Sequence, residues 1–137
     1  MKNNFIENIN DEKYFYSLIE DIENSKVGFY SVGLYPASLA YNCAMHGKSN
    51  NILLAPREDR DLLGAFSNDV LSDMDNETIE KIKRMGHYSS EGIRKSFDLK
   101  DLLLECEIVI LASNSNHIQD DVKIALELRK TLKRENV

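Results

Sequence analysis

The chain has 137 residues, enough for one domain with a sizeable hydrophobic core, and its composition of 42% hydrophobic and 29% charged residues is typical of a globular protein. The net charge of -6 disfavours nucleic acid as a partner. No apolar run is long enough for a membrane span, and the N-terminus lacks the apolar segment of a targeting signal. The two cysteines, Cys43 and Cys106, have no metal-ligand spacing and fit free thiols in a reducing compartment. We therefore expect a cytoplasmic protein without membrane partners.

Residues 1–25 are expected to form an N-terminal extension that contains one helix, beginning near Asp11 and ending at Asn24-Ser25. The apolar residues of this segment fall at helical spacing: Phe15, Leu18, Ile19 and Ile22. Its aromatic cluster at 14–16 fits core packing, and a homodimer contact is the alternative use.

A strand, a tight turn and a helix are predicted next. Val27–Ser31 is almost continuously apolar, as expected of a strand that is covered on both faces. The following helix is predicted over about Tyr35 to His46, with Pro36 in its first turn and Gly47 as the residue that ends it.

Strands and helices continue to alternate along the rest of the chain. The sequence predicts a strand over 51–55, a helical turn within 57–66 and a loop over 67–75. A helix capped by Asp75 or Asn76 and closed by Gly86 follows, and then a loop over 87–92 and a short strand over 93–97. The last predicted elements are a helix capped by Asp98, a strand over 107–112, and a helix with a capping box at Asn116 and Gln119. This alternation indicates an α/β fold with a doubly wound parallel sheet.

The turn between the first strand and its helix has the features of an anion site. A dinucleotide site needs a tight turn, a close approach of the backbone, and a helix N-terminus that directs free N–H groups at phosphates. The segment Ser31-Val32-Gly33-Leu34-Tyr35-Pro36 occupies the window of the G-x-G-x-x-G fingerprint, and Gly33 is the glycine that lets the backbone approach the pyrophosphate. Ser31 and Pro36 replace the other two glycines.

Two blocks of the sequence resemble the NAD(P)-dependent glycerol-3-phosphate dehydrogenases. They are VGFYSVGLYPASLAYNCAMHG, with its strand, turn, small-residue helix and closing glycine, and FDLKDLLLECEIVILASNSNHIQDDV, with its helix, strand, turn and helix. N-terminal domains of opine dehydrogenases are similar in outline and share a histidine where His117 stands. The resemblance covers roughly Lys26 to Lys133.

This resemblance implies a Rossmann-like, three-layer α/β/α domain over 26–137 that binds NAD or NADP and belongs to an oxidoreductase. The implied cofactor-binding residues are Ser31, Val32, Gly33, Leu34, Tyr35, Pro36, Arg57, Ser113 and Asn114. The second strand ends in Ala55-Pro56-Arg57, without the acidic residue that binds a ribose, so Arg57 favours the 2′-phosphate of NADP. Arg57 as a surface residue, and Ser113 and Asn114 as turn formers, are the alternatives.

The family's helical substrate domain and its catalytic lysine have no counterpart here, so we expect no catalytic residue in this chain and a place within a longer protein. No histidine pair or acidic loop has the spacing of a metal site. Because two fingerprint glycines are replaced, a regulatory or protein-interaction module without dinucleotide binding is the second hypothesis. A smaller phosphate-bearing ligand at the same helix N-terminus is the third.

Overall fold

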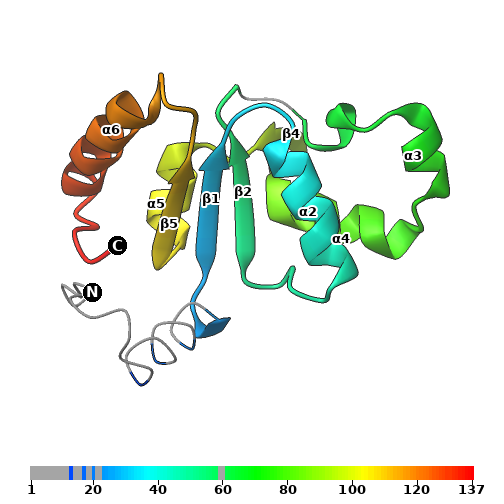
Figure 1. The fold of residues 1–137 in the computed structure, drawn as a ribbon, viewed down its shortest axis with the longest axis horizontal. Coiled ribbons are helices and arrows are strands. Elements are labelled where there is room, and N and C mark those ends of the chain that lie inside the picture. Colours follow the sequence, from blue (N-terminus) through cyan, green and yellow to red (C-terminus); the bar gives the residue numbers. More distant parts are fainter. Residues whose placement is uncertain (1–12, 14–16, 18–19, 21–22, 59–60) are drawn as a thin grey trace.

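The computed structural model describes residues 23–58 and 61–137, together with Lys13, Ser17 and Glu20. The elements follow in the order β1 (Val27–Ser31), α2 (Tyr35–Met45), β2 (Ile52–Pro56), the 3-10 turn η1 (Leu63–Ala65), α3 (Asn68–Asp73), α4 (Asn76–Gly86), β3 (His87–Ser90), β4 (Ile93–Ser96), α5 (Leu99–Glu105), β5 (Ile108–Ala112) and α6 (Ile118–Thr131). The chain is thus mixed α/β, as the sequence predicts (Figure 1). The helix expected from Asp11 falls mostly on residues outside those described.

A three-stranded parallel sheet forms the centre of the domain, in the order β2-β1-β5 (Figure 1). The strands are in register, so that Ser31, Pro56 and Ala112 share the last row and the three carboxyl ends meet at one edge. β5 pairs with β1 on one side, and no other strand of the described chain pairs with its second edge.

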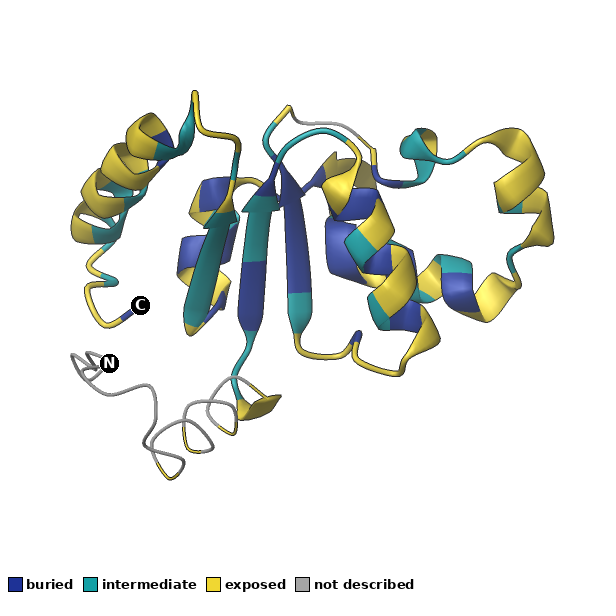
Figure 2. Ribbon diagram, in the orientation of Figure 1, coloured by how far each residue is buried: buried dark blue, intermediate teal, exposed yellow. Residues whose placement is uncertain are grey.

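Helices cover both faces of this sheet because the strands are apolar on both faces. On one face, Leu54 of β2 packs with Ala40 of α2 and Ile82 of α4. On the other face, Leu53 of β2 packs with Leu102 of α5, and α6 covers part of β5. Figure 2 shows that burial is deepest around β2, that β5 is mostly intermediate, and that α3 and much of α6 are exposed.

Several helices begin or end at capping residues that the sequence predicts. Gly47 has φ +68°, and Lys48 N–H donates to Cys43 O at 2.9 Å, which is the Schellman end that the glycine predicts for α2. Asp75 caps α4, and Asp98 forms a capping box with Asp101 at the start of α5. The expected box at Asn116 and Gln119 is absent, because α6 begins after His117 without a side-chain cap.

Two segments predicted as loops are regular structure. The segment 67–75 contains α3, capped by Ser67, whose hydroxyl accepts from Val70 N–H. The segment 87–92 contains β3, which pairs with β4 in an antiparallel hairpin. Among the described residues, no helix has both the length and the apolar character of a membrane span.

Candidate functional site

The turn after β1 contains a backbone conformation that favours glycine, and Gly33 occupies it. Gly33 has φ +67°, in the left-handed region, and a Cβ added to it would meet nothing within 4 Å. The space above this backbone is therefore open to a ligand. Pro36 lies buried in the first turn of α2, and Ser31 is also buried, whereas Leu34 and Tyr35 are exposed. Ser31 and Pro36 therefore pack inside the domain.

A hollow of about 670 Å³ opens between α2 and the carboxyl ends of β1 and β5. This volume lies within the range of small-molecule sites. Five of the nine residues predicted to bind the cofactor line it, and these are Ser31, Val32, Tyr35, Ser113 and Asn114. The remaining wall is largely apolar and comes from β1, β5 and α2, with residues such as Phe29, Ile110 and Leu39.

Ser113 and Asn114 follow β5 and differ in their hydrogen-bond partners. The side-chain oxygen of Asn114 accepts from Asn116 N–H at 3.1 Å, and its carbonyl accepts from His117 N–H and Ile118 N–H. Asn114 is thus a turn former at the start of α6. The Ser113 hydroxyl is buried and has no hydrogen-bond partner among the described residues. A buried hydroxyl without a partner costs free energy, and a rotation of the Ser113 side chain toward the hollow would let a ligand or water satisfy this oxygen.

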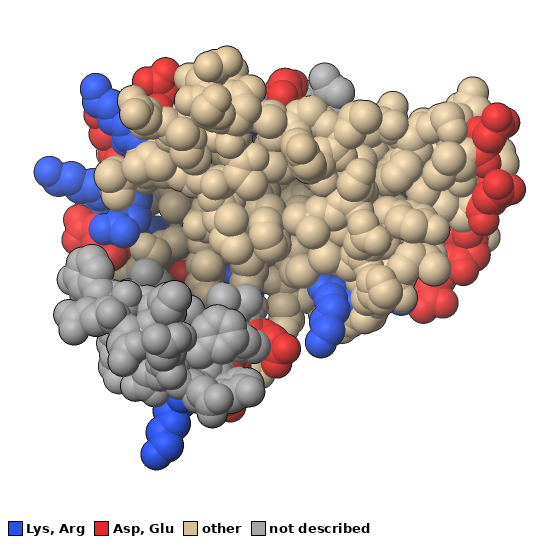
Figure 3. Space-filling model, viewed as in Figure 1, with Lys and Arg blue, Asp and Glu red and all other residues tan. Residues whose placement is uncertain are grey.

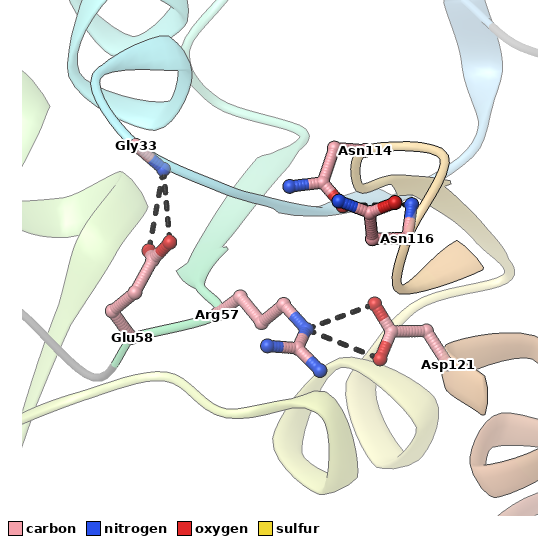
Figure 4. Close-up of polar contacts among 6 residues, drawn as sticks. All are labelled: Gly33, Arg57, Glu58, Asn114, Asn116 and Asp121. Atoms are coloured by element: carbon pink, nitrogen blue, oxygen red, sulfur yellow. Dashed lines mark hydrogen bonds and ion pairs between the residues drawn. The ribbon is translucent and has the colours of Figure 1, made fainter.

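A carboxylate already lies on the backbone of Gly33. Gly33 N–H points at both oxygens of Glu58, with N···O distances of 3.1 Å and 3.3 Å (Figure 4). The N–H of the fingerprint glycine is therefore already bonded to a carboxylate of the protein itself. Glu58 reaches it from just after β2.

Arg57 is turned away from this turn and toward α6 (Figure 4). Its Nε donates to both carboxylate oxygens of Asp121, at 3.2 Å and 3.1 Å. Asp121 is 2% exposed, and the hydrogen bond between the two side chains raises the pKa of Arg57. Nearby, burial and the negative charge of Asp121 raise the pKa of Tyr30. Arg57 is thus the partner of a buried acid, and it does not line the hollow.

The strand-end pattern that selects the other site residues does not select Glu58 or Asp121. Glu58 stands two residues beyond the last residue of β2, outside the position where the fingerprint expects an acid. A helical wheel could have identified Asp121, because this charged residue falls at helical spacing with Ala125, Leu128 and Leu132 on the covered side of α6. Among the described residues, no group of three or more potential ligands could hold a metal ion.

The fit of a dinucleotide can be tested on these atoms. The open backbone at Gly33, the unpartnered Ser113 hydroxyl and the volume of the hollow fit such a molecule. Glu58 fits if its carboxylate stays on the Gly33 N–H and the phosphates take the other free N–H groups at the N-terminus of α2. The residues present therefore fit the cofactor that the sequence predicts.

No curated protein and no solved structure shows significant similarity to this chain. Residues 21–137 match the model of a family that is described as a domain of unknown function, DUF8649. The match spans most of the chain, and the protein therefore belongs to the DUF8649 family.

Proposed function

We propose that this domain is Rossmann-like and binds an NAD(P)-class dinucleotide at the carboxyl edge of its sheet. The observation that carries the proposal is topological. The chain leaves β1 toward β2 on one side and later places β5 on the other side, so the direction of winding reverses between β1 and β5. In open α/β sheets, ligands bind outside the carboxyl ends of the strands at such a switch point. The hollow with Ser31, Val32, Ser113 and Asn114 lies at this point.

The position of each residue indicates which part of the dinucleotide it would contact. The N-terminus of α2 offers its free backbone N–H groups for the pyrophosphate, and Gly33 leaves the space above the adjoining backbone open. Ser113 lines the hollow, and a rotation of its side chain would bring its buried hydroxyl to the part of the ligand that lies by β5. The bound nicotinamide supplies hydride transfer, and the domain binds and orients it as the cofactor-binding part of a dehydrogenase-like oxidoreductase. Catalytic residues for the substrate would come from outside the described residues.

Titration calorimetry with NADH and NADPH tests the proposal, and the chain offers a matched pair of variants. Gly33→Ala and Gly47→Ala each place a Cβ at a residue with positive φ and open surroundings, so both should cost the same stability, about 1 kcal/mol. Only Gly33→Ala should weaken dinucleotide binding, by about tenfold or more, because its Cβ stands between the backbone and the phosphates.

Equal affinity in the two variants would argue against a site at the Gly33 turn. If a folded wild-type sample bound neither dinucleotide at millimolar concentration, the proposed function would be wrong.

A second candidate, a protein-interaction module, is favoured by one specific observation. Val122 and Leu126 of α6 are exposed and line an apolar groove of about 200 Å³ beside β5. Exposed apolar surface of this kind is typical of protein contacts. The dinucleotide titration separates the two candidates, since an interaction module would not need the Ser113 hydroxyl or the open backbone of Gly33.

A further inference from the structure

The end of β2 decides which dinucleotide the site accepts, and the structure gives its two charged residues unexpected partners. NAD and NADP differ only at the adenosine ribose, which carries a 2′-hydroxyl in one and a 2′-phosphate in the other. A carboxylate at this strand end binds the hydroxyl, and an arginine binds the phosphate. Here both groups are present in consecutive positions, as Arg57 and Glu58.

Arg57 is engaged by a buried acid. Its Nε bonds both oxygens of Asp121, whose side chain is 2% exposed, while the Arg57 side chain is 28% exposed. If Arg57 turned toward a ligand, Asp121 would keep a buried negative charge without its cation, which is strongly unfavourable. Asp121 therefore holds Arg57 at α6 and neutralises its charge.

Because Arg57 is held at α6, the charged side chain that lies at the turn after β1 is Glu58. Its carboxylate lies 3.1 Å and 3.3 Å from the Gly33 nitrogen, so it stands at the same turn as the proposed pyrophosphate contact. A ribose hydroxyl can donate a hydrogen bond to this carboxylate. A 2′-phosphate offers only acceptors and negative charge there, and like charges at short range repel.

We propose that the site selects the dinucleotide with a free 2′-hydroxyl, NAD, with Glu58 as the group that binds the ribose. Asp121 is a positioning residue, because it acts by withholding Arg57 from the ligand. This inference rests on the proposed function, and it reverses the preference for NADP that Arg57 suggests when the sequence is considered alone.

Calorimetry with NADH and NADPH on a set of variants tests the inference. The wild-type domain should bind NADH at least about tenfold more tightly than NADPH. Asp121→Asn should release Arg57 and raise NADPH affinity about tenfold, with NADH affinity changed by less than about threefold. The gain should vanish in Asp121→Asn combined with Arg57→Gln. A purely structural effect of Asp121 would weaken both ligands together.

Two further variants complete the set. Asp120→Asn is the matched control, since it removes the same charge from the same first turn of α6 at an exposed side chain and should leave both affinities unchanged. Arg57→Gln alone should not change NADPH affinity, and this comparison holds even if Asp121→Asn fails to fold.

The outcomes are distinct. Tighter binding of NADPH by the wild type, or a loss of NADPH affinity in Arg57→Gln, would overturn the inference while dinucleotide binding stands. Binding of neither molecule by a folded wild type would overturn the proposed function and the inference with it.

Discussion

Cys106 shows what burial does to a single reactive group. The residue has no exposed surface and packs with Leu102 against the sheet, and its sulfur lies 3.0 Å from the position that a Cβ on Gly28 would take. Burial raises the pKa of the Cys106 thiol from 9.0 to about 11. The thiolate is the reactive form of cysteine, so this thiol is chemically inert at neutral pH.

This shift predicts a loss of stability in alkaline solution. The folded state holds the thiol proton more tightly than the unfolded state, so the stabilising contribution is complete below pH 9 and is lost as the pH rises from about 9 to about 11. The free energy of unfolding, measured by denaturant titration across this range, should fall more steeply for the wild type than for Cys106→Ala. Parallel slopes for the two proteins would show that Cys106 does not carry the effect.

Gly86, at the junction of α4 and β3, shows how tightly the elements of this fold meet. A Cβ on this residue would overlap the side chain of Leu62, which is 1% exposed and belongs to the core beside Ile82 and Met85. Leu62 comes from the segment before η1, so Gly86 allows this segment and α4 to pack in contact.

We therefore expect Gly86→Ala to destabilise the protein by about 1–3 kcal/mol, because the added methyl group overpacks the core. Gly64→Ala is the control, since the new Cβ would lie 3.7 Å from the nearest side-chain atom, in ordinary contact, and the residue is exposed. This variant should be neutral or slightly stabilising. Thermal or denaturant unfolding measures both, and an equal stability of the two variants would contradict the expected packing.

The elements that could be predicted are those whose pattern is strong and local. β1, β2 and β5 are short apolar runs, and Gly47, Asp75 and Asp98 mark helix ends by their own chemistry. Element type and order followed from these signals.

Only one half of the β3–β4 hairpin could be predicted. The short strand predicted over 93–97 corresponds to β4, whereas β3, with the polar sequence HYSS, lies in a segment predicted as a loop and pairs only with β4. The hairpin turn, Glu91-Gly92, has φ +56° and +80°, but Glu-Gly is a weaker hairpin signal than Asn-Gly.

For the candidate site, too, positions set by local sequence could be predicted, whereas contacts set by tertiary packing could not. The predicted residues that meet in the hollow lie at or just after the carboxyl ends of β1 and β5, and the parallel sheet brings these strand ends together. The partner of Arg57 lies 64 residues away in the sequence, and the Glu58 contact depends on the path of the chain beyond β2. Pairings of this kind are set by tertiary packing, so a strand-end pattern cannot reveal them.

The two ends of the molecule differ in charge. Figure 3 shows acidic side chains at the end formed by α3, and basic side chains mixed with acidic ones at the opposite end, near α6. Two of the basic residues of α6 and its tail donate hydrogen bonds to backbone carbonyls. Arg134 donates to the carbonyls of Leu103 and Cys106 at 3.0 Å and 3.2 Å, and Arg129 donates to that of Val137 at 3.0 Å. These bonds hold the C-terminal end of the chain against α5.

One edge of β5 pairs with no strand of the described part of the chain, and this predicts a pattern of amide hydrogen exchange. Ile108 N–H donates toward β1, to Lys26 O, and successive N–H groups of a strand alternate in direction. The amides of Ile110 and Ala112 should therefore be protected, whereas those of Val109 and Leu111 face the free edge and should exchange rapidly. NMR-detected exchange would resolve this odd–even pattern, with the central strand β1, paired on both sides, as the slow reference.

Uniform protection along β5 would contradict this pattern and show that another strand occupies the free edge. The exchange rates of the β5 amides would then distinguish a sheet that ends at β5 from one that continues into a neighbouring molecule.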